Sequence, residues 1–254
     1  MIFEHKLDRI TCATLLTEAI KYLIFQRYQI PLPFDQLKAE DERERRSEEG
    51  KLPKGQASRP SSLAVKKSRQ LIAGVEELLG RLYHVFVQVQ VFDVLLLLGS
   101  TVVNPKEIYS IRFLNVGKVT EADRLKAISL SGKENGLATR SKFVDKCCRK
   151  LARMLFTDPN LNECGELKCT SINCFILAPR DAGIDWFKPK ASFKVPKKGK
   201  CYFINVSESK TTTEDRDVQG EEVQEDTMWF QAPTVLKGYK EMYKETVESS
   251  IWGK

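Results

Sequence analysis

Histidine is nearly absent from this sequence, which carries only His5 and His84 among its 254 residues. A Ser-His-Asp or Cys-His catalytic site would have to use one of these two side chains. His5 lies close to the first residue, and His84 falls at the end of a predicted helix beside an apolar run, where a structural role is the simpler interpretation. The scarcity of histidine therefore argues against nucleophilic catalysis.

Motifs for nucleotides and metals are also missing. Neither a GxxxxGK[ST] phosphate loop nor a GxGxxG turn after a strand occurs, so nucleotide binding by the backbone has no support. Cys164, Cys169 and Cys174 lack the paired CxxC spacing of structural zinc sites. The carboxylates of ERERRSEE and EDRDVQGEEVQED fall in segments expected to be mobile, which do not suit acid-base chemistry. We expect no enzyme activity, no cofactor and no metal.

No apolar run is long enough to cross a bilayer. The longest, Val85–Gly99, is interrupted by polar residues and is shorter than the roughly 20 residues that a spanning helix needs. The start, MIFEHKLDRI, lacks a basic segment followed by an apolar one, so no secretory signal is expected. The seven cysteines show no disulfide-framework spacing. These features favour a soluble intracellular protein in a reducing compartment, without a membrane partner.

The chain is basic and has enough apolar residues for a core. Its 41 basic and 34 acidic residues give a net charge of +7, and 42% of its residues are hydrophobic. The charges are interspersed, so basicity alone makes only a weak argument for nucleic acid and fits an acidic protein partner equally well.

Apolar residues at steps of three and four predict three helices. The first covers Asp8–Phe25 and ends before Pro31, the second covers 61–86, and the third carries the stripe of Val144–Leu155 and ends at Pro159. Short apolar runs between turn residues predict the strands. These lie at Phe92–Leu98, Glu107–Leu114, Ser171–Leu177, Ser192–Val195, Tyr202–Val206 and Met228–Ala232.

Two charged segments carry too little apolar surface to offset the entropy of ordering. They predict a mobile charged loop at 38–60 and an acidic loop at 208–226. With the helices and strand pairs between them, they indicate one α+β domain, in which three helices pack on a mainly antiparallel sheet.

Four long segments occur in an order that resembles the comet family, the vertebrate partners of the mitotic-checkpoint HORMA protein. They are FQRYQIPLPFDQLK (25–38), VLLLLGSTVVNPKEIY (94–109), DWFKPKASFKVPKKG (185–199) and WFQAPTVLKGYKE (229–241). The resemblance implies a HORMA-like domain over 6–241 with a C-terminal belt-like region, followed by an extension at 242–254.

The resemblance also implies a function. A comet-like protein is a non-enzymatic adaptor that docks on the closed conformer of the checkpoint HORMA protein and presents it to a hexameric Pch-type AAA+ ATPase. The ATPase supplies the work that disassembles the checkpoint complex and silences the checkpoint. The expected localisation is nucleus and cytoplasm, with spindle or kinetochore association in mitosis.

Residues of both interfaces follow from the matched motifs. Gln26 matches a partner-contacting glutamine at the end of the first helix. The third helix matches the main docking element, and its candidates for the closed HORMA protein are Lys146, Arg149, Lys150, Arg153 and Phe156. Ala152 stands where a family member has a contact phenylalanine, so Phe156 is the expected apolar anchor. Without the resemblance, Gln26 is an exposed helix-end residue and the basic face is simply solvated.

The motif DWFKPK supplies candidates for the ATPase. Pro189 and Lys190 match the family loop that engages it, while Trp186 and Phe187 are expected to pack in the core beneath that loop. Two other functions stay open: a HORMA protein that captures its own peptide with its belt, and a nucleic-acid-binding protein that uses the basic helix with the KKSR and KKGK clusters.

Overall fold

The computed structural model describes residues 1–5, 7–50, 63–114, 141–162, 164–208 and 226–240. Its helices are α1 (Arg9–Gln26), α2 (Phe34–Gly50), α3 (Leu63–Gln88), α5 (Lys142–Thr157) and α6 (Pro159–Asn162). Its strands are β1 (Ile2–Phe3), β2 (Asp93–Leu98), β3 (Glu107–Leu114), β4 (Ser171–Pro179), β5 (Lys188–Pro189), β6 (Lys200–Glu208), β7 (Thr227–Gln231) and β8 (Leu236–Lys237). The α+β class expected from the sequence is confirmed.

The strands form one sheet in the order β1-β6-β3-β2-β4-β7-β5, and β8 pairs with β4. The parallel pairs are β1 with β6 and β3 with β6, and the other pairs of described strands are antiparallel. The predicted strands β2 and β3 are present and form an antiparallel hairpin, in which Val94 pairs with Ile111 and Leu98 with Glu107. Strands β7 and β8 follow one another along the same edge of β4.

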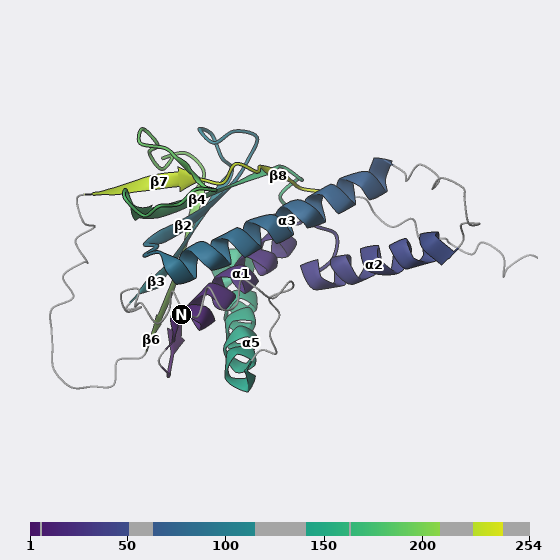
Figure 1. Cartoon of the computed structure of the whole chain (residues 1–254), viewed down its shortest axis with the longest axis horizontal. Helices are drawn as coiled ribbons and strands as arrows, with labels where there is room; N and C mark the ends of the chain where they lie inside the picture. The colour runs from purple at the N-terminus through teal and green to yellow at the C-terminus, as the bar shows by residue number, and fades with distance from the viewer. Residues whose placement is uncertain (6, 51–62, 115–140, 163, 209–225, 241–254) are drawn as a thin grey trace, which may run out of the picture.

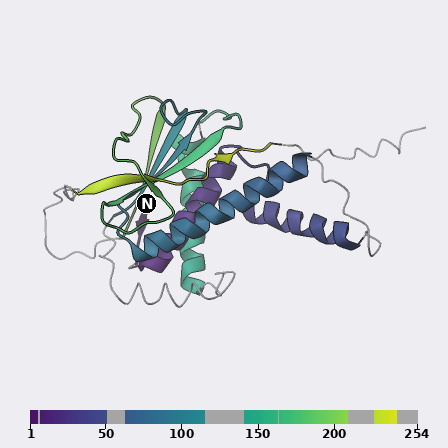
Figure 2. The same cartoon turned by 45° about the horizontal axis from the view of Figure 1, so that its top comes forward.

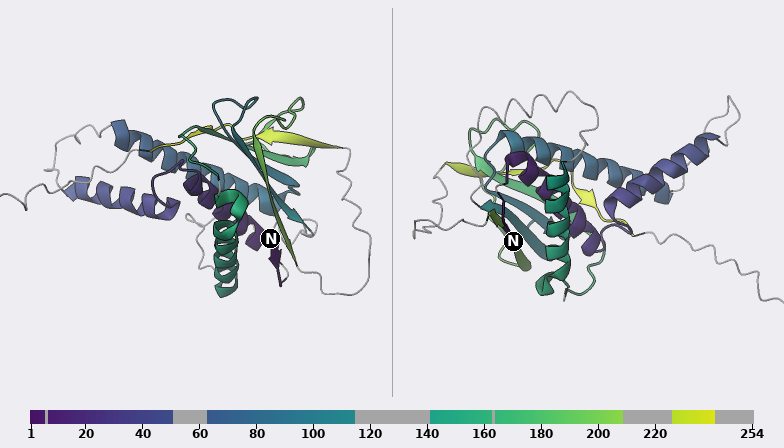
Figure 3. Two further views of the ribbon diagram at one scale, coloured as in Figure 1. Left: turned by 180° about the vertical axis from the view of Figure 1, so that it is seen from behind. Right: turned by 90° about the horizontal axis from the view of Figure 1, so that it is seen from below.

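Helices α1, α3 and α5 form a layer beside the sheet, with α1 between the other two (Figure 1). Helix α1 begins at its N-cap Asp8, whose Oδ1 accepts a hydrogen bond from the Thr11 backbone at 2.8 Å. Its residues Cys12, Leu16 and Ile20 are buried, as the predicted stripe requires. Figure 3 shows α5 standing beside α1 in two further views.

The sheet buries apolar side chains on both faces, because successive strand residues point to opposite sides. Val94 and Leu96 belong to the main core with the helices, whereas Leu95 and Leu97 belong to a second cluster. Phe193 packs against this second cluster and stacks on the Phe175 ring, with 4.2 Å between ring centroids.

The prediction of a strand at Ser192–Val195 is wrong. These residues form a turn and coil, and the nearest strand is β5. Apolar and polar residues alternate here for a reason other than strand pairing. The Phe193 side chain packs on the face of the sheet, while its backbone lies outside every strand.

The prediction of a mobile loop at 38–60 is wrong for its first part, where α2 continues the chain as a helix. The buried Asp41 pairs with Arg45 one helical turn later and with Arg69 of α3, at 2.8 Å in each case. Opposite charges within α2 and across to α3 stabilise a helix that apolar periodicity alone does not reveal. Figure 2 shows α2 extending from the domain beside α3. The rest of the segment lies outside the described residues.

Two other predicted segments fall mostly or wholly outside the described residues. These are the acidic loop at 208–226, of which Glu208 and Asp226 are described, and the extension at 242–254. Glu208 is the last residue of β6 and not part of a loop. The limits 6–241 of the HORMA-like domain stay a prediction.

Candidate partner-binding surface

Helix α5 is strongly amphipathic. Its N-cap Ser141 accepts a hydrogen bond from the Val144 backbone at 3.2 Å, and Cys147, Leu151 and Leu155 are buried at a spacing of four. The buried stripe packs against α1. This packing fixes which side of α5 faces solvent.

The solvent-facing side of α5 carries Lys146, Arg149 and Arg153, which we call the basic stripe. They follow one another at steps of three and four residues and therefore share one helix face. Phe156 continues the stripe and is 66% exposed, which is unusual for a phenylalanine. Within the described part of the chain, no ion pair involves the basic stripe. The surface is thus cationic with an apolar end.

Lys150 differs from the other predicted basic residues of α5. Its Nζ lies 5.4 Å from the centre of the Phe3 ring and 3.9 Å from Glu4 Oε1. These contacts hold Lys150 beside the N-terminal strand, so it is less exposed than Arg149 or Arg153, although 39% of its side chain stays in contact with solvent.

Gln26 lies on the same side as the end of α5. Its Nε2 donates to Asn162 Oδ1 at 3.0 Å, and Asn162 Nδ2 donates to the backbone oxygen of Phe156. The end of α1 is thereby joined to the end of α5, so the structure brings Gln26 close to the Phe156 backbone.

A buried ion pair fixes the turn that follows Gln26. Arg27 Nε and Nη2 donate to the two carboxylate oxygens of Glu107 at 2.8 and 2.6 Å, and Nη2 also donates to the Gly165 backbone oxygen at 2.9 Å. Tyr109 Oη donates to Glu107 at 2.8 Å, and burial raises the pKa of this phenol. Sequence reasoning missed this pair, because nothing in the local pattern links residues 80 positions apart.

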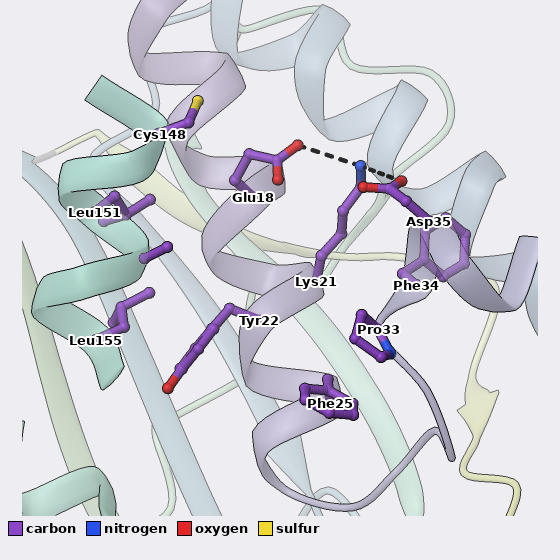
Figure 4. A pocket seen from close by; sticks show the side chains of 11 residues that line it. Glu18, Lys21, Tyr22, Phe25, Pro33, Phe34, Asp35, Cys148, Leu151 and Leu155 are labelled. Atoms are coloured by element: carbon purple, nitrogen blue, oxygen red, sulfur yellow. Dashed lines mark hydrogen bonds and ion pairs between the residues drawn. The ribbon is translucent and has the colours of Figure 1, made fainter. Parts of the chain in front are cut away.

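A groove of about 260 Å³ runs between α1, α5 and the start of α2 (Figure 4). Its lining residues are Glu18, Lys21, Tyr22, Phe25, Pro33, Phe34, Asp35, Cys148, Leu151, Ala152 and Leu155. Lys21 bridges Glu18 at 3.2 Å and Asp35 at 2.9 Å, so the charges on this side of the groove are paired with one another. Ala152, the departure from the family pattern, is exposed and belongs to this lining.

Pro189 and Lys190 lie on another part of the molecule, at the β5 edge of the sheet. Pro189 pairs with Phe230, and the Lys190 backbone N–H donates to the Trp229 oxygen at 2.8 Å. Both side chains are exposed. The edge position suits proline, which has no N–H for a further strand.

Phe187 and Trp186 were both expected to pack in the core beneath this edge, but they differ in burial. Phe187 is fully buried, whereas Trp186 is half-buried and its Nε1 donates to Glu77 of α3 at 3.2 Å. The two side chains therefore fix the β5 segment against α3.

Both histidines contact aromatic rings. The His5 ring contacts Phe143 and the His84 ring contacts Tyr83, both edge to face. No group of three or more His, Cys, Asp or Glu side chains in the described ranges is arranged to hold a metal. No described helix is both long and apolar enough to cross a membrane.

Comparison with known proteins decides the family. A family model described as "p31comet: Mad1 and Cdc20-bound-Mad2 binding" matches residues 1–241. The chain belongs to the p31comet family. The resemblance of its four segments to comet proteins is therefore confirmed.

Two curated relatives agree with the p31comet assignment. The mouse (Mus musculus) MAD2L1-binding protein is 28% identical over 241 residues, which cover 95% of this chain and 78% of the relative. The human (Homo sapiens) MAD2L1-binding protein is 27% identical over the same length and 79% of the relative is covered. By name, this family consists of binding proteins and not of enzymes.

Proposed function

We propose that this chain is a non-enzymatic adaptor that binds the closed conformer of Mad2, the mitotic-checkpoint HORMA protein. The observation that carries the proposal is the p31comet match over residues 1–241 of a chain whose α5 presents an exposed cationic and apolar surface. The two relatives, both named for binding MAD2L1, support the same partner.

The docking surface that we propose consists of Gln26, the basic stripe and Phe156. Its cations suit an acidic patch on the partner, which would steer association and fix the orientation. Phe156 offers apolar area that is already exposed, and such residues often contribute most of the binding energy. The amide of Gln26 can both donate and accept at the rim.

The arrangement of the C-terminal strands β7 and β8 fits an adaptor better than it fits a HORMA protein that captures a peptide. The edge of β4 is already occupied by β7 and β8 of the same chain, from Ser171–Lys237 at one end to Pro179–Thr227 at the other. An extended peptide could not pair with that edge unless these strands left it. This arrangement supports a HORMA-like domain whose belt-like region is closed on itself.

We further propose that the exposed pair Pro189 and Lys190 engages a hexameric Pch-type AAA+ ATPase. Pro189 ends β5 at the edge of the sheet and Lys190 follows it, whereas the docking surface lies on α1 and α5, so both partners could bind at once. An adaptor selective for the closed state would direct the ATPase to trapped complexes and so silence the checkpoint. This role is consistent with a protein of nucleus and cytoplasm that joins the spindle or kinetochore in mitosis.

The binding proposal is tested by capture of Mad2 locked in its open or closed form. The purified chain should retain closed Mad2 only, and Arg153→Glu combined with Gln26→Ala should reduce the affinity at least about tenfold. Lys67→Glu on α3 is the matched control, because Lys67 is also an exposed helical cation, and it should leave capture unchanged. Equal capture of both forms would contradict the proposal.

The proposed contact with the ATPase is tested separately, by the ATP-dependent release of Mad2 from its complexes. Lys190→Glu should leave capture of closed Mad2 intact and abolish the release of Mad2 complexes by the ATPase and ATP. Lys194→Glu, an exposed lysine four residues later, serves as the charge control. Binding of DNA that falls steeply with salt and requires the basic stripe would instead support the nucleic-acid alternative.

A further inference from the structure

The side chain of Glu77 on α3 holds two segments that lie far apart in the sequence. Its Oε1 accepts a hydrogen bond from Trp186 Nε1 at 3.2 Å, and its Oε2 accepts one from Thr234 Oγ1 at 3.3 Å. Trp186 lies just before β5, and Thr234 lies between β7 and β8. One carboxylate therefore joins the segment that enters β5 to the link between the two C-terminal strands.

The same face of α3 makes further contacts with both segments. Gly74 and Arg81 share this face with Glu77, because they lie one helical turn before and after it. The Arg81 guanidinium lies 5.9 Å from the centre of the Trp186 ring. A Cβ at Gly74 would lie 2.9 Å from the Leu236 side chain, so β8 packs closely on the helix there, as Figure 1 shows. We call Glu77 and Arg81 the α3 clamp.

Strand β5 depends on β7 for its place in the sheet. Among the described strands it pairs with β7 alone, where Pro189 lies opposite Phe230. The Lys190 backbone N–H then donates to the Trp229 oxygen at 2.8 Å. Because β7 in turn pairs with β4, departure of β7 from β4 would take away the strand that holds β5. The edge that carries Pro189 and Lys190 is thus formed only while β7 is docked.

Backbone pairing alone holds β5 weakly, because the strand has two residues, fewer than strands usually have. Side chains supply the remaining anchors. Phe187 is fully buried, and the Trp186 ring packs edge to face against it at 4.9 Å between ring centroids. The bond from Trp186 to Glu77 ties this pair of rings to α3. The position of β5 therefore depends on the α3 clamp as well as on β7.

We propose that the α3 clamp and the docked strand β7 together position the ATPase-contacting edge, so that the ATPase engages this chain only while its C-terminal strands are paired with β4. Glu77 is a positioning residue, which acts by holding the two segments that build the edge. The proposal rests on the ATPase contact proposed above and adds a condition for it. The docking surface on α1 and α5 is separate from the clamp, so capture of closed Mad2 does not depend on Glu77.

The test measures the concentration of the purified chain that gives half-maximal ATP-dependent release of Mad2 by the ATPase. Glu77→Ala should raise this concentration at least about fivefold, because fewer molecules carry a formed edge. The release rate at saturating chain and the affinity for closed Mad2 should stay unchanged. Glu77→Gln keeps an acceptor for Trp186 and gains an amide donor toward Thr234 Oγ1, so it should behave as the wild type does.

A second variant examines the link to the C-terminal strands. Thr234→Val removes the hydroxyl but keeps the side-chain shape, and it should raise the half-maximal concentration about threefold. Glu76→Ala is the matched control, because this neighbouring carboxylate pairs with Lys38 and not with either segment, and it should have no effect. Hydrogen exchange of Glu77→Ala should be faster at 186–190 and 234–237 and unchanged in α5.

The outcomes separate the two proposals. A wild-type chain that supports no release by the ATPase contradicts the proposed ATPase contact itself. A wild-type chain that supports release, together with an unchanged half-maximal concentration for Glu77→Ala, contradicts the clamp alone. An effect of Glu77→Ala that Thr234→Val does not share would show that the C-terminal strands play no part, and it would overturn the proposal. Equal loss in Glu77→Gln, with a lower melting temperature, would assign the effect to the general fold and overturn it as well.

Discussion

Arg27 and Glu107 form a bidentate ion pair in the interior, with side-chain exposures of 2% and 6%. Arg27 is the C-cap of α1 and directly follows Gln26, and Glu107 begins β3. The pair therefore connects the helical layer to the sheet at the point where the docking surface begins. The Glu107 carboxylate and the Gly165 carbonyl together accept three hydrogen bonds from the guanidinium.

Removing one partner of this pair should be strongly destabilising. Arg27→Met leaves the Glu107 carboxylate buried without its cation, and we expect a loss of about 3–5 kcal/mol in the free energy of unfolding. Urea denaturation followed by circular dichroism measures it. Arg27→Met with Glu107→Leu should recover most of the loss. Arg45→Met, which breaks the more exposed pair with Asp41, should cost under about 1 kcal/mol, and an equal cost for both single variants would contradict the account.

Two glycine substitutions should have opposite effects. A Cβ at Gly238 would collide with Gln29 Oε1, and that oxygen cannot move away easily because it accepts from the Thr170 backbone at 2.8 Å. Gly238→Ala should therefore cost about 1–3 kcal/mol in urea denaturation. Gly80→Ala meets no atom within 4 Å and should add about 0.5–1 kcal/mol through helix propensity in α3. A stabilising Gly238→Ala would show that the β8 segment packs differently.

Cysteine reactivity should follow burial. Burial raises the pKa of Cys12 to about 12 and that of Cys174 as well, whereas Cys201 is exposed on β6. At pH 8 a thiol with a pKa of 12 is ionised in only about one molecule in 10⁴, and the thiolate is the reactive form. Iodoacetamide at pH 8 should thus label Cys201 first and leave Cys12 and Cys174 unlabelled until urea unfolds the chain. Mass spectrometry of the native protein would refute this if it found Cys12 labelled early.

Periodicity predicted the elements whose burial follows the helix or strand repeat. The helices α1 and α5 were predicted in this way because each buries one face, and the strands β2 and β3 because their apolar runs lie mostly inside. Helix α2 escaped prediction because its stability depends on ion pairs such as Asp41 with Arg69, whose partner belongs to another helix. Phe193 misled the strand prediction because a single buried ring in a coil imitates alternation.

The candidate surface was predictable only through resemblance. Composition could not distinguish a docking stripe at Arg149 and Arg153 from a solvated helix face, and the sequence gives no sign that Gln26 lies near Phe156. The structure joins those two through Asn162, whereas it directs the partly exposed Lys150 toward the Phe3 ring. The groove at Ala152 was not foreseen, because a cavity depends on what distant residues leave unfilled.

The most direct test of the central claim is hydrogen exchange of the full chain with and without closed Mad2. The account predicts slower amide exchange at the end of α1 and across residues 146–156 of α5, with no change in residues 66–75 of α3. Protection of α3 or of the outer sheet face, with α5 unchanged, would contradict the claim that the α1 and α5 surface binds the partner.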